Sequence, residues 1–196
     1  MSKPTQPNSP LRPPQPRLSS QTNMPLRPQQ PSLSSQSNPA LRVTPTHLQK
    51  APVLKDFPVS GLELICDIAR RKFLRVGQIL FDEGAPSEAL YLVIEGRVQL
   101  TMKAEDGRVA KLGALGEGEL LGQSALLDDA THHLCTAMAE SETLLIEITA
   151  ADFQRLSQEK PRLGVTLKQF ISVDLDQKLL SAGPALRPLF IRAFAS

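Results

Sequence analysis

The stretch GQILFDEGAPSEALYLVIEGRVQL, residues 77–100, decides the fold of this chain. Its short apolar runs are separated by single glycines, which is typical of strands joined by tight turns. At the end of the stretch and just beyond it, Val98, Leu100 and Met102 alternate with polar residues. This period of two predicts a strand that buries one face and exposes the other.

Further apolar runs of strand length follow. They read RVAKLGALG, HLCTAMAE and ETLLIEI, with turn residues at roughly ten-residue intervals. An Asp-Gly pair at residues 106–107 lies between two of the runs and is a strong hairpin signal. Six or more short strands with this spacing predict a mainly β fold, an antiparallel sandwich or jelly roll.

Helical periodicity flanks the strands on both sides. Residues 59–69 are amphipathic and predict a helix that Arg70 to Lys72 would end. After the strands, Thr149 precedes Asp152 by three residues in a capping-box-like start, and Pro161 suits the first turn of a second helix. Apolar residues recur along this second helix at Leu163, Leu167, Phe170 or Ile171, Leu175 and Leu179. The stripe can close over the strands or meet its copy in a second subunit, so a homodimer is left open.

Residues 1–50 differ in composition from the rest of the chain. They hold eleven of the 17 prolines and no acidic residue, and their six Lys and Arg give a charge of +6. Since the whole chain carries +2, residues 51–196 carry the difference, −4. A segment so poor in apolar residues is expected to be disordered. The sequence therefore predicts a disordered tail over residues 1–50, a folded domain over residues 51–181 and a short tail over residues 182–196.

The N-terminal tail contains a repeat. NSPLR, NMPLR and NPALR begin at Asn8, Asn23 and Asn38, fifteen residues apart. One interpretation is a duplicated, extended spacer. The other is a set of weak docking motifs for a protein partner, whose linkage would raise avidity.

Several classes of protein are disfavoured. No apolar run approaches the roughly 20 residues that span a bilayer, and the start lacks the apolar run of a secretory leader, so a cytoplasmic protein is expected. Cys66 and Cys135 lie in apolar surroundings and are expected to be small core residues. The folded part is acidic and no helix-turn-helix fits after residue 181, so no direct DNA binding is expected.

Catalytic and metal-binding patterns are also missing from the sequence. His132 and His133 are adjacent, so in a strand their side chains would point to opposite faces and could not share one metal. The paired Asp128 and Asp129 are interpreted as a solvated turn. With no nucleophile and base pair visible, we expect no enzyme, no metal and no cofactor.

Residues 54–180 resemble the cyclic nucleotide-binding domain family. Gly77, Gly84 and Gly96 fall where that family has its turn glycines, and Tyr91 is in place between them. The run LGEGELLGQSALL is similar to the family's phosphate-binding cassette. The resemblance implies an antiparallel jelly-roll β-barrel with a helix in front, a short cassette helix, and C-terminal helices that relay ligand occupancy.

The resemblance also implies a ligand site and shows two departures from it. The family's cassette glutamate, which accepts a hydrogen bond from the ribose, corresponds to Gln123, and its phosphate-gripping arginine corresponds to His133. The backbone of the cassette is retained, and amide groups at Gln123, Ser124 and Ala125 are expected to face an anion. The candidate ligand-binding residues are Gly122, Gln123, Ser124, Ala125 and His133.

A neutral His133 weakens phosphate binding. Two charge-assisted hydrogen bonds at roughly 1.5 to 3 kcal/mol each would be lost, which is about 10² to 10⁴ in affinity. We therefore expect a non-catalytic regulatory or sensor protein with a degenerate cassette, acting through protein contacts by way of the tail repeats or the C-terminal helices. The alternative is a genuine cyclic nucleotide receptor with weakened or altered ligand preference.

Two further expectations concern the same residue. Protonation would restore a positive charge on His133, so nucleotide binding is predicted to tighten below about pH 6.5. Against any ligand role, His133 could be a solvated or capped strand residue, with Gln123 bonded only within its own loop.

Overall fold

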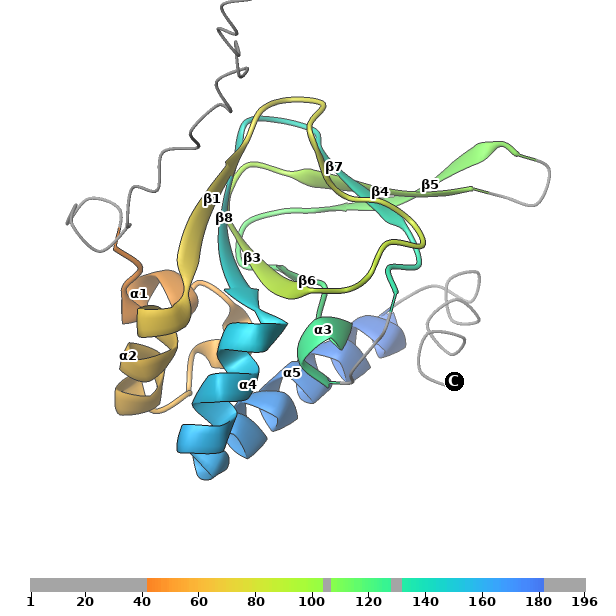
Figure 1. Cartoon of the computed structure of the whole chain (residues 1–196). Coiled ribbons are helices and arrows are strands. Elements are labelled where there is room, and N and C mark those ends of the chain that lie inside the picture. Colours follow the sequence, from red (N-terminus) through yellow and green to blue (C-terminus); the bar gives the residue numbers. More distant parts are fainter. Residues whose placement is uncertain (1–41, 104–106, 128–131, 182–196) are drawn as a thin grey trace, which may run out of the picture. The chain divides into compact units, whose positions relative to one another are not determined.

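The computed structural model describes residues 42–103, 107–127 and 132–181 (Figure 1). The tail repeats, the Asp128–Asp129 pair and residues 182–196 lie outside this part of the chain. The described elements, in chain order, are α1 (Pro45–Leu48), η2 (Pro52–Leu54), α2 (Val59–Ile68), β1 (Arg70–Leu74), β2 (Ile79–Phe81), β3 (Ala89–Glu95), β4 (Val98–Lys103), β5 (Val109–Leu115), β6 (Leu120–Leu121), α3 (Ser124–Leu127), β7 (Thr136–Ala139), β8 (Thr143–Thr149), α4 (Ala150–Glu159) and α5 (Pro161–Ser181).

The described strands form two antiparallel sheets of four strands each, whose arrangement can be followed in Figure 1. One has the order β1-β8-β3-β6 and the other the order β2-β7-β4-β5. This is the double-sheet arrangement of a jelly roll, and the predicted fold class is confirmed. The hairpin predicted at the Asp-Gly pair is also confirmed, because β4 and β5 pair directly on either side of it.

Strand β1 corrects the prediction that Arg70 to Lys72 end the preceding helix. Helix α2 ends at Ile68, and Arg70 already begins a strand that pairs with β8. β1 is the outer strand of its sheet, where charged side chains reach solvent and are well tolerated. A run of three basic residues therefore fits a strand at this position.

Strand β3 is buried on both faces and divides the core into two clusters. Leu90, Leu92 and Ile94 pack with the helices, while Tyr91 and Val93 pack between the two sheets. A strand covered on both faces has an almost continuous apolar sequence. This explains the unbroken run ALYLVI within the stretch that decides the fold.

The helices cover the outer face of the sheet that contains β3. The predicted cap of α4 is confirmed, because the Thr149 hydroxyl accepts a hydrogen bond from the Asp152 amide at 3.1 Å. Helix α5 begins at Pro161, as predicted, and its apolar stripe is buried at Leu167 and Ile171. The stripe is thus used within the chain at these two residues, and a homodimer is still left open.

The boundary of the N-terminal tail at residue 50 is wrong, because residues 42–50 belong to the fold. Helix α1 is capped by Thr44, and its Leu48 is only 1% exposed in the core beneath the helices. The Lys50 ammonium donates to the Ile94 carbonyl at 3.1 Å and pairs with Glu117. The proline-rich composition of the residues before it hid this short segment.

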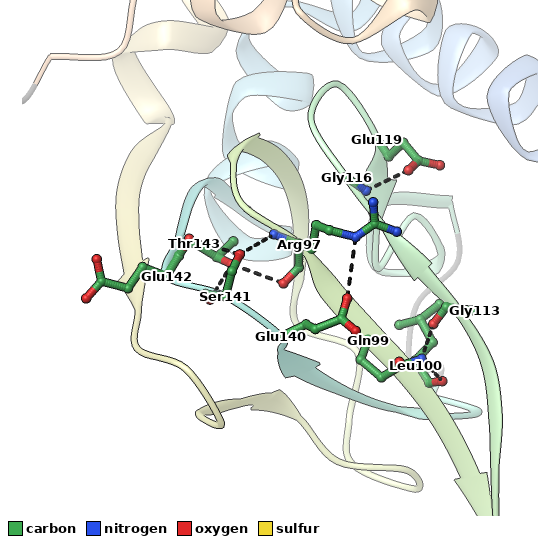
Figure 2. Close-up of polar contacts among 10 residues, drawn as sticks. All are labelled: Arg97, Gln99, Leu100, Gly113, Gly116, Glu119, Glu140, Ser141, Glu142 and Thr143. Carbon is green, nitrogen blue, oxygen red and sulfur yellow. Dashed lines mark hydrogen bonds and ion pairs between the residues drawn. The ribbon is translucent and has the colours of Figure 1, made fainter.

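Gln99 corrects the predicted alternation of β4. It was expected on the solvent face, yet it is 8% exposed, with its amide nitrogen donating to the carbonyls of Gly113 and Leu100 (Figure 2). The β4–β5 register shifts between Leu100 and Thr101, which interrupts the simple period of two. A buried amide is tolerated where its donors are satisfied in this way.

The two cysteines are free and half-buried. Burial is the largest cause that raises the pKa of Cys66 and of Cys135, each to about 11. Both thiols therefore stay protonated at neutral pH, as expected for packing residues.

Candidate functional site

The cassette is built around two glycines in the left-handed region. Gly118 has a φ of +83° and Gly122 a φ of +68°, so both form the tight turns predicted for them. At Gly122 a β-carbon would collide with the carbonyl oxygen of Ala89 on β3. Glycine is therefore required for the cassette to lie close against β3.

The first turn of α3 uses part of the hydrogen-bonding capacity predicted for an anion. The Ala125 amide donates to the Gly122 carbonyl at 3.1 Å, so the expectation that this amide is free is wrong. The Ser124 hydroxyl lies 3.1 Å from the hydroxyl of Ser87, in the loop before β3. In this four-residue helix, the amide of the first turn bonds to a carbonyl of the preceding residues. The sequence pattern does not show this bond.

Gln123 is engaged by the C-terminal helix. Its side chain is 8% exposed, and its amide nitrogen donates to the Leu120 carbonyl at 3.2 Å and to the Asp174 carboxylate of α5 at 3.0 Å. The sequence-based alternative, in which Gln123 is bonded only within its own loop, is therefore incomplete. The side chain links the cassette to α5.

His133 is buried and stacked on an aromatic ring. Its imidazole lies parallel to the Phe81 ring, with centroids 3.6 Å apart and an interplanar angle of 7°. The residue is 8% exposed, and its backbone amide donates to the Ala85 carbonyl at 2.8 Å. It is therefore not a solvated strand residue, whereas its neighbour His132 is exposed.

The environment of His133 keeps it neutral. Burial, and after it the charge of His132, lower the pKa of His133 from 6.5 to about 4. Protonation of His133 in the chain without ligand is thereby moved from about pH 6.5 toward about pH 4, and the prediction that nucleotide binding tightens on protonation stays a prediction. The burial that is the largest cause of this shift could not be read from the sequence.

The lowered pKa of His133 has a consequence for stability. As the pH falls below 6.5, His133 takes up a proton in the unfolded chain before it does so in the folded chain. Neutral His133 therefore contributes fully to the free energy of unfolding above about pH 6.5, and this contribution is lost as the pH falls toward 4. At about pH 5 the loss is about 2 kcal/mol.

Urea unfolding of the full chain should show that His133→Phe, which keeps a stacked ring without the titration, loses about 2 kcal/mol less than wild type between about pH 7 and about pH 5. Equal losses would contradict this.

A polar cluster on the same face of the sheet as Tyr91 was missed by sequence reasoning. Lys72 of β1 pairs with Glu147 of β8 at 2.7 Å, and its ammonium lies 5.3 Å from the centre of the Tyr91 ring. Burial, followed by the charge of Glu147, raises the pKa of Tyr91. These residues come together only through the pairing of three strands.

The described residues form neither a metal cluster nor a membrane-spanning helix. These residues hold no group of three or more metal-ligating side chains, and none of their helices combines the length and apolar character needed to cross a bilayer. A groove of about 670 Å³ lies between the start of α2 and the α4–α5 turn, with Phe57, Leu64 and Leu163 in its lining. None of the candidate ligand-binding residues is in that lining.

Part of this chain is similar to known proteins. Residues 71–160 match the family model described as cyclic nucleotide-binding domain. Lysophospholipase nte1 of Neurospora crassa is 34% identical over 96 residues, which are 49% of this chain but only 6% of that protein. The chain thus spans a small fraction of the curated relatives that it matches.

Solved structures show the same fold. The N-terminal domain of a transcriptional regulator from Streptomyces coelicolor A3(2) is 26% identical, with a TM-score of 0.59, covering 69% of this chain and 96% of that one. The regulatory subunit of a cAMP-independent protein kinase A from Trypanosoma cruzi, bound to guanosine, is 17% identical, with a TM-score of 0.60, covering 76% and 47%. The likeness predicted from the turn glycines is therefore confirmed: residues 71–160 match the cyclic nucleotide-binding domain model, and the solved structures share the fold.

Proposed function

We propose that this chain is a non-catalytic regulatory or sensor protein whose cyclic nucleotide-binding-type domain has a degenerate cassette. It acts through contacts with a protein partner, made by the tail repeats or by the C-terminal helices. The observation that carries the proposal is the buried, stacked and neutral His133 at the position of the family's arginine. A cytoplasmic location belongs to the same proposal, whereas a homodimer is left open.

The site offers a cyclic phosphate little positive charge. A neutral imidazole in place of arginine forfeits roughly 3 to 6 kcal/mol of phosphate binding. The Gln123 amide nitrogen is held by Asp174, so Gln123 can offer a ribose only its neutral amide oxygen, without the charge of the family's glutamate. These two features support a dissociation constant for cyclic AMP in the millimolar range or weaker.

The alternative is a receptor with altered ligand preference. It is favoured by the retained cassette backbone, with Gly118 and Gly122 in their turns and Ser124 at the start of α3. A site without a cation suits a ligand without a phosphate. Guanosine, which is named with the T. cruzi protein, is a natural probe of that class.

Thermal unfolding of the full chain with cyclic AMP, cyclic GMP and guanosine tests both candidates. At about 100 µM ligand, a dissociation constant near 1 µM would add about 2.7 kcal/mol of stability, whereas a millimolar constant would add less than about 0.1 kcal/mol. We expect no measurable shift with either cyclic nucleotide. A shift of several degrees with one of them would overturn the proposal, and a shift with guanosine alone would favour the altered receptor.

A further inference from the structure

Helix α5 is joined to the cassette by a group of polar contacts that we call the anchor cluster: Gln123, Asp174, Lys178 and the carbonyl of Leu120. The Gln123 amide nitrogen donates to Asp174 at 3.0 Å. The Lys178 ammonium pairs with Asp174 at 3.1 Å and donates to the Leu120 carbonyl at 2.8 Å. The cluster thus joins α5 to both β6 and the residue that precedes α3.

The anchor cluster is largely shielded from water. Gln123 is 8% exposed, the Asp174 side chain is 13% exposed, and Lys178 is partly buried. Next to the cluster, Leu167 and Ile171 of α5 are packed in the core beneath the helices. Polar groups in such surroundings bind one another strongly when paired and are costly when unpaired.

The polarity of the cluster depends on an amide at position 123. Gln123 acts as donor and Asp174 as acceptor, so a carboxylate at position 123 would face a second carboxylate at hydrogen-bonding distance. Glutamate and glutamine have nearly the same shape, which leaves charge as the difference. Lys178 could approach such a carboxylate, but one ammonium would then serve two negative charges.

We propose that Gln123 is an anchoring residue for α5 and that Asp174, together with Lys178, requires an amide at position 123. In this arrangement residue 123 positions the C-terminal helix and does not contact a ligand. The bond to Asp174 uses the amide nitrogen, so α5 fixes the orientation of the amide oxygen that a ribose would approach. The inference rests on the contacts of α5 and is independent of whether any nucleotide binds.

Reversing the polarity of the pair tests the proposal. Gln123→Glu combined with Asp174→Asn exchanges donor and acceptor while keeping the net charge and nearly the same volume. Hydrogen–deuterium exchange is measured on the full chain for wild type, the two single variants and the double variant. Asp176→Asn is the matched control, because Asp176 lies exposed on the same helix. Peptides from α2 report whether each variant is folded.

We expect Gln123→Glu to speed exchange in the C-terminal half of α5 roughly 10- to 100-fold, the equivalent of one lost hydrogen bond to a charged group. Asp174→Asn should give a smaller increase, because an asparagine oxygen still accepts from Gln123. The double variant should return to within about threefold of wild type, and Asp176→Asn should match wild type. Wild-type exchange in Gln123→Glu, or a double variant no better protected than Gln123→Glu, would overturn the proposal.

Discussion

Replacement of Gly96 by alanine is expected to lower the free energy of unfolding by about 3 to 5 kcal/mol. Gly96 has a φ of +90° in the turn between β3 and β4. A β-carbon there would strike the carbonyl oxygen of Glu142 and lie 2.8 Å from the α-carbon of Thr143. Both obstacles belong to the backbone of the neighbouring turn, so neither can rotate away as a side chain would.

That neighbouring turn is itself fixed by hydrogen bonds, as Figure 2 shows. The Thr143 hydroxyl donates to the Arg97 carbonyl at 3.1 Å, and the Arg97 amide donates to the Ser141 hydroxyl at 3.0 Å. The matched control is Gly77→Ala, because Gly77 has a φ of +78° but an added β-carbon there would meet no atom within 4 Å. Urea unfolding should give a loss of about 1 to 2 kcal/mol for the control. Equal losses of unfolding free energy for the two variants would contradict the prediction, because they would show that the positive φ alone, and not the collision at Gly96, sets the effect.

Replacement of His133 by arginine is expected to raise the affinity for cyclic AMP about 10- to 100-fold. The guanidinium supplies the charge that the neutral imidazole lacks. The gain is smaller than the full value of two charge-assisted bonds, because the stacking on Phe81 is lost and Gln123 remains bonded to Asp174. Isothermal titration calorimetry on the full chain measures the change.

The exposed neighbour provides the control for that experiment. His132→Arg adds the same charge one residue away, at a position open to solvent. We expect less than about a threefold change in affinity, because an exposed charge is screened. A similar gain from both variants would mean that general attraction, and not the geometry at residue 133, controls binding.

The sequence was sufficient for the fold because its signals are local. The glycines that precede and follow β3, the Asp-Gly hairpin and the cap of α4 each act within a few residues. Strand β1 and helix α1 were missed, since the first is a charged outer strand and the second is a single turn at the end of a proline-rich tail.

The site could be predicted only in part. The resemblance to the cyclic nucleotide-binding domain family implied the positions of Gln123 and His133, but the contacts of these side chains depend on residues far away in the chain. Gln123 bonds to a carboxylate 51 residues later, and the imidazole of His133 stacks on a ring of β2. Burial and stacking of this kind arise when the sheets and helices come together, so no local pattern records them.

The position of Lys50 has a practical consequence for cutting this protein into fragments. The backbone carbonyl oxygen of Lys50 lies against Gly118, in the turn that leads into the cassette. A β-carbon added to Gly118 would be 2.6 Å from this oxygen. A fragment that starts at Ala51 would lose this contact. It would also lack the buried Leu48 side chain, so the space that this side chain fills in the core would be open to water. An isolated domain intended for crystals or binding assays should therefore begin no later than Arg42.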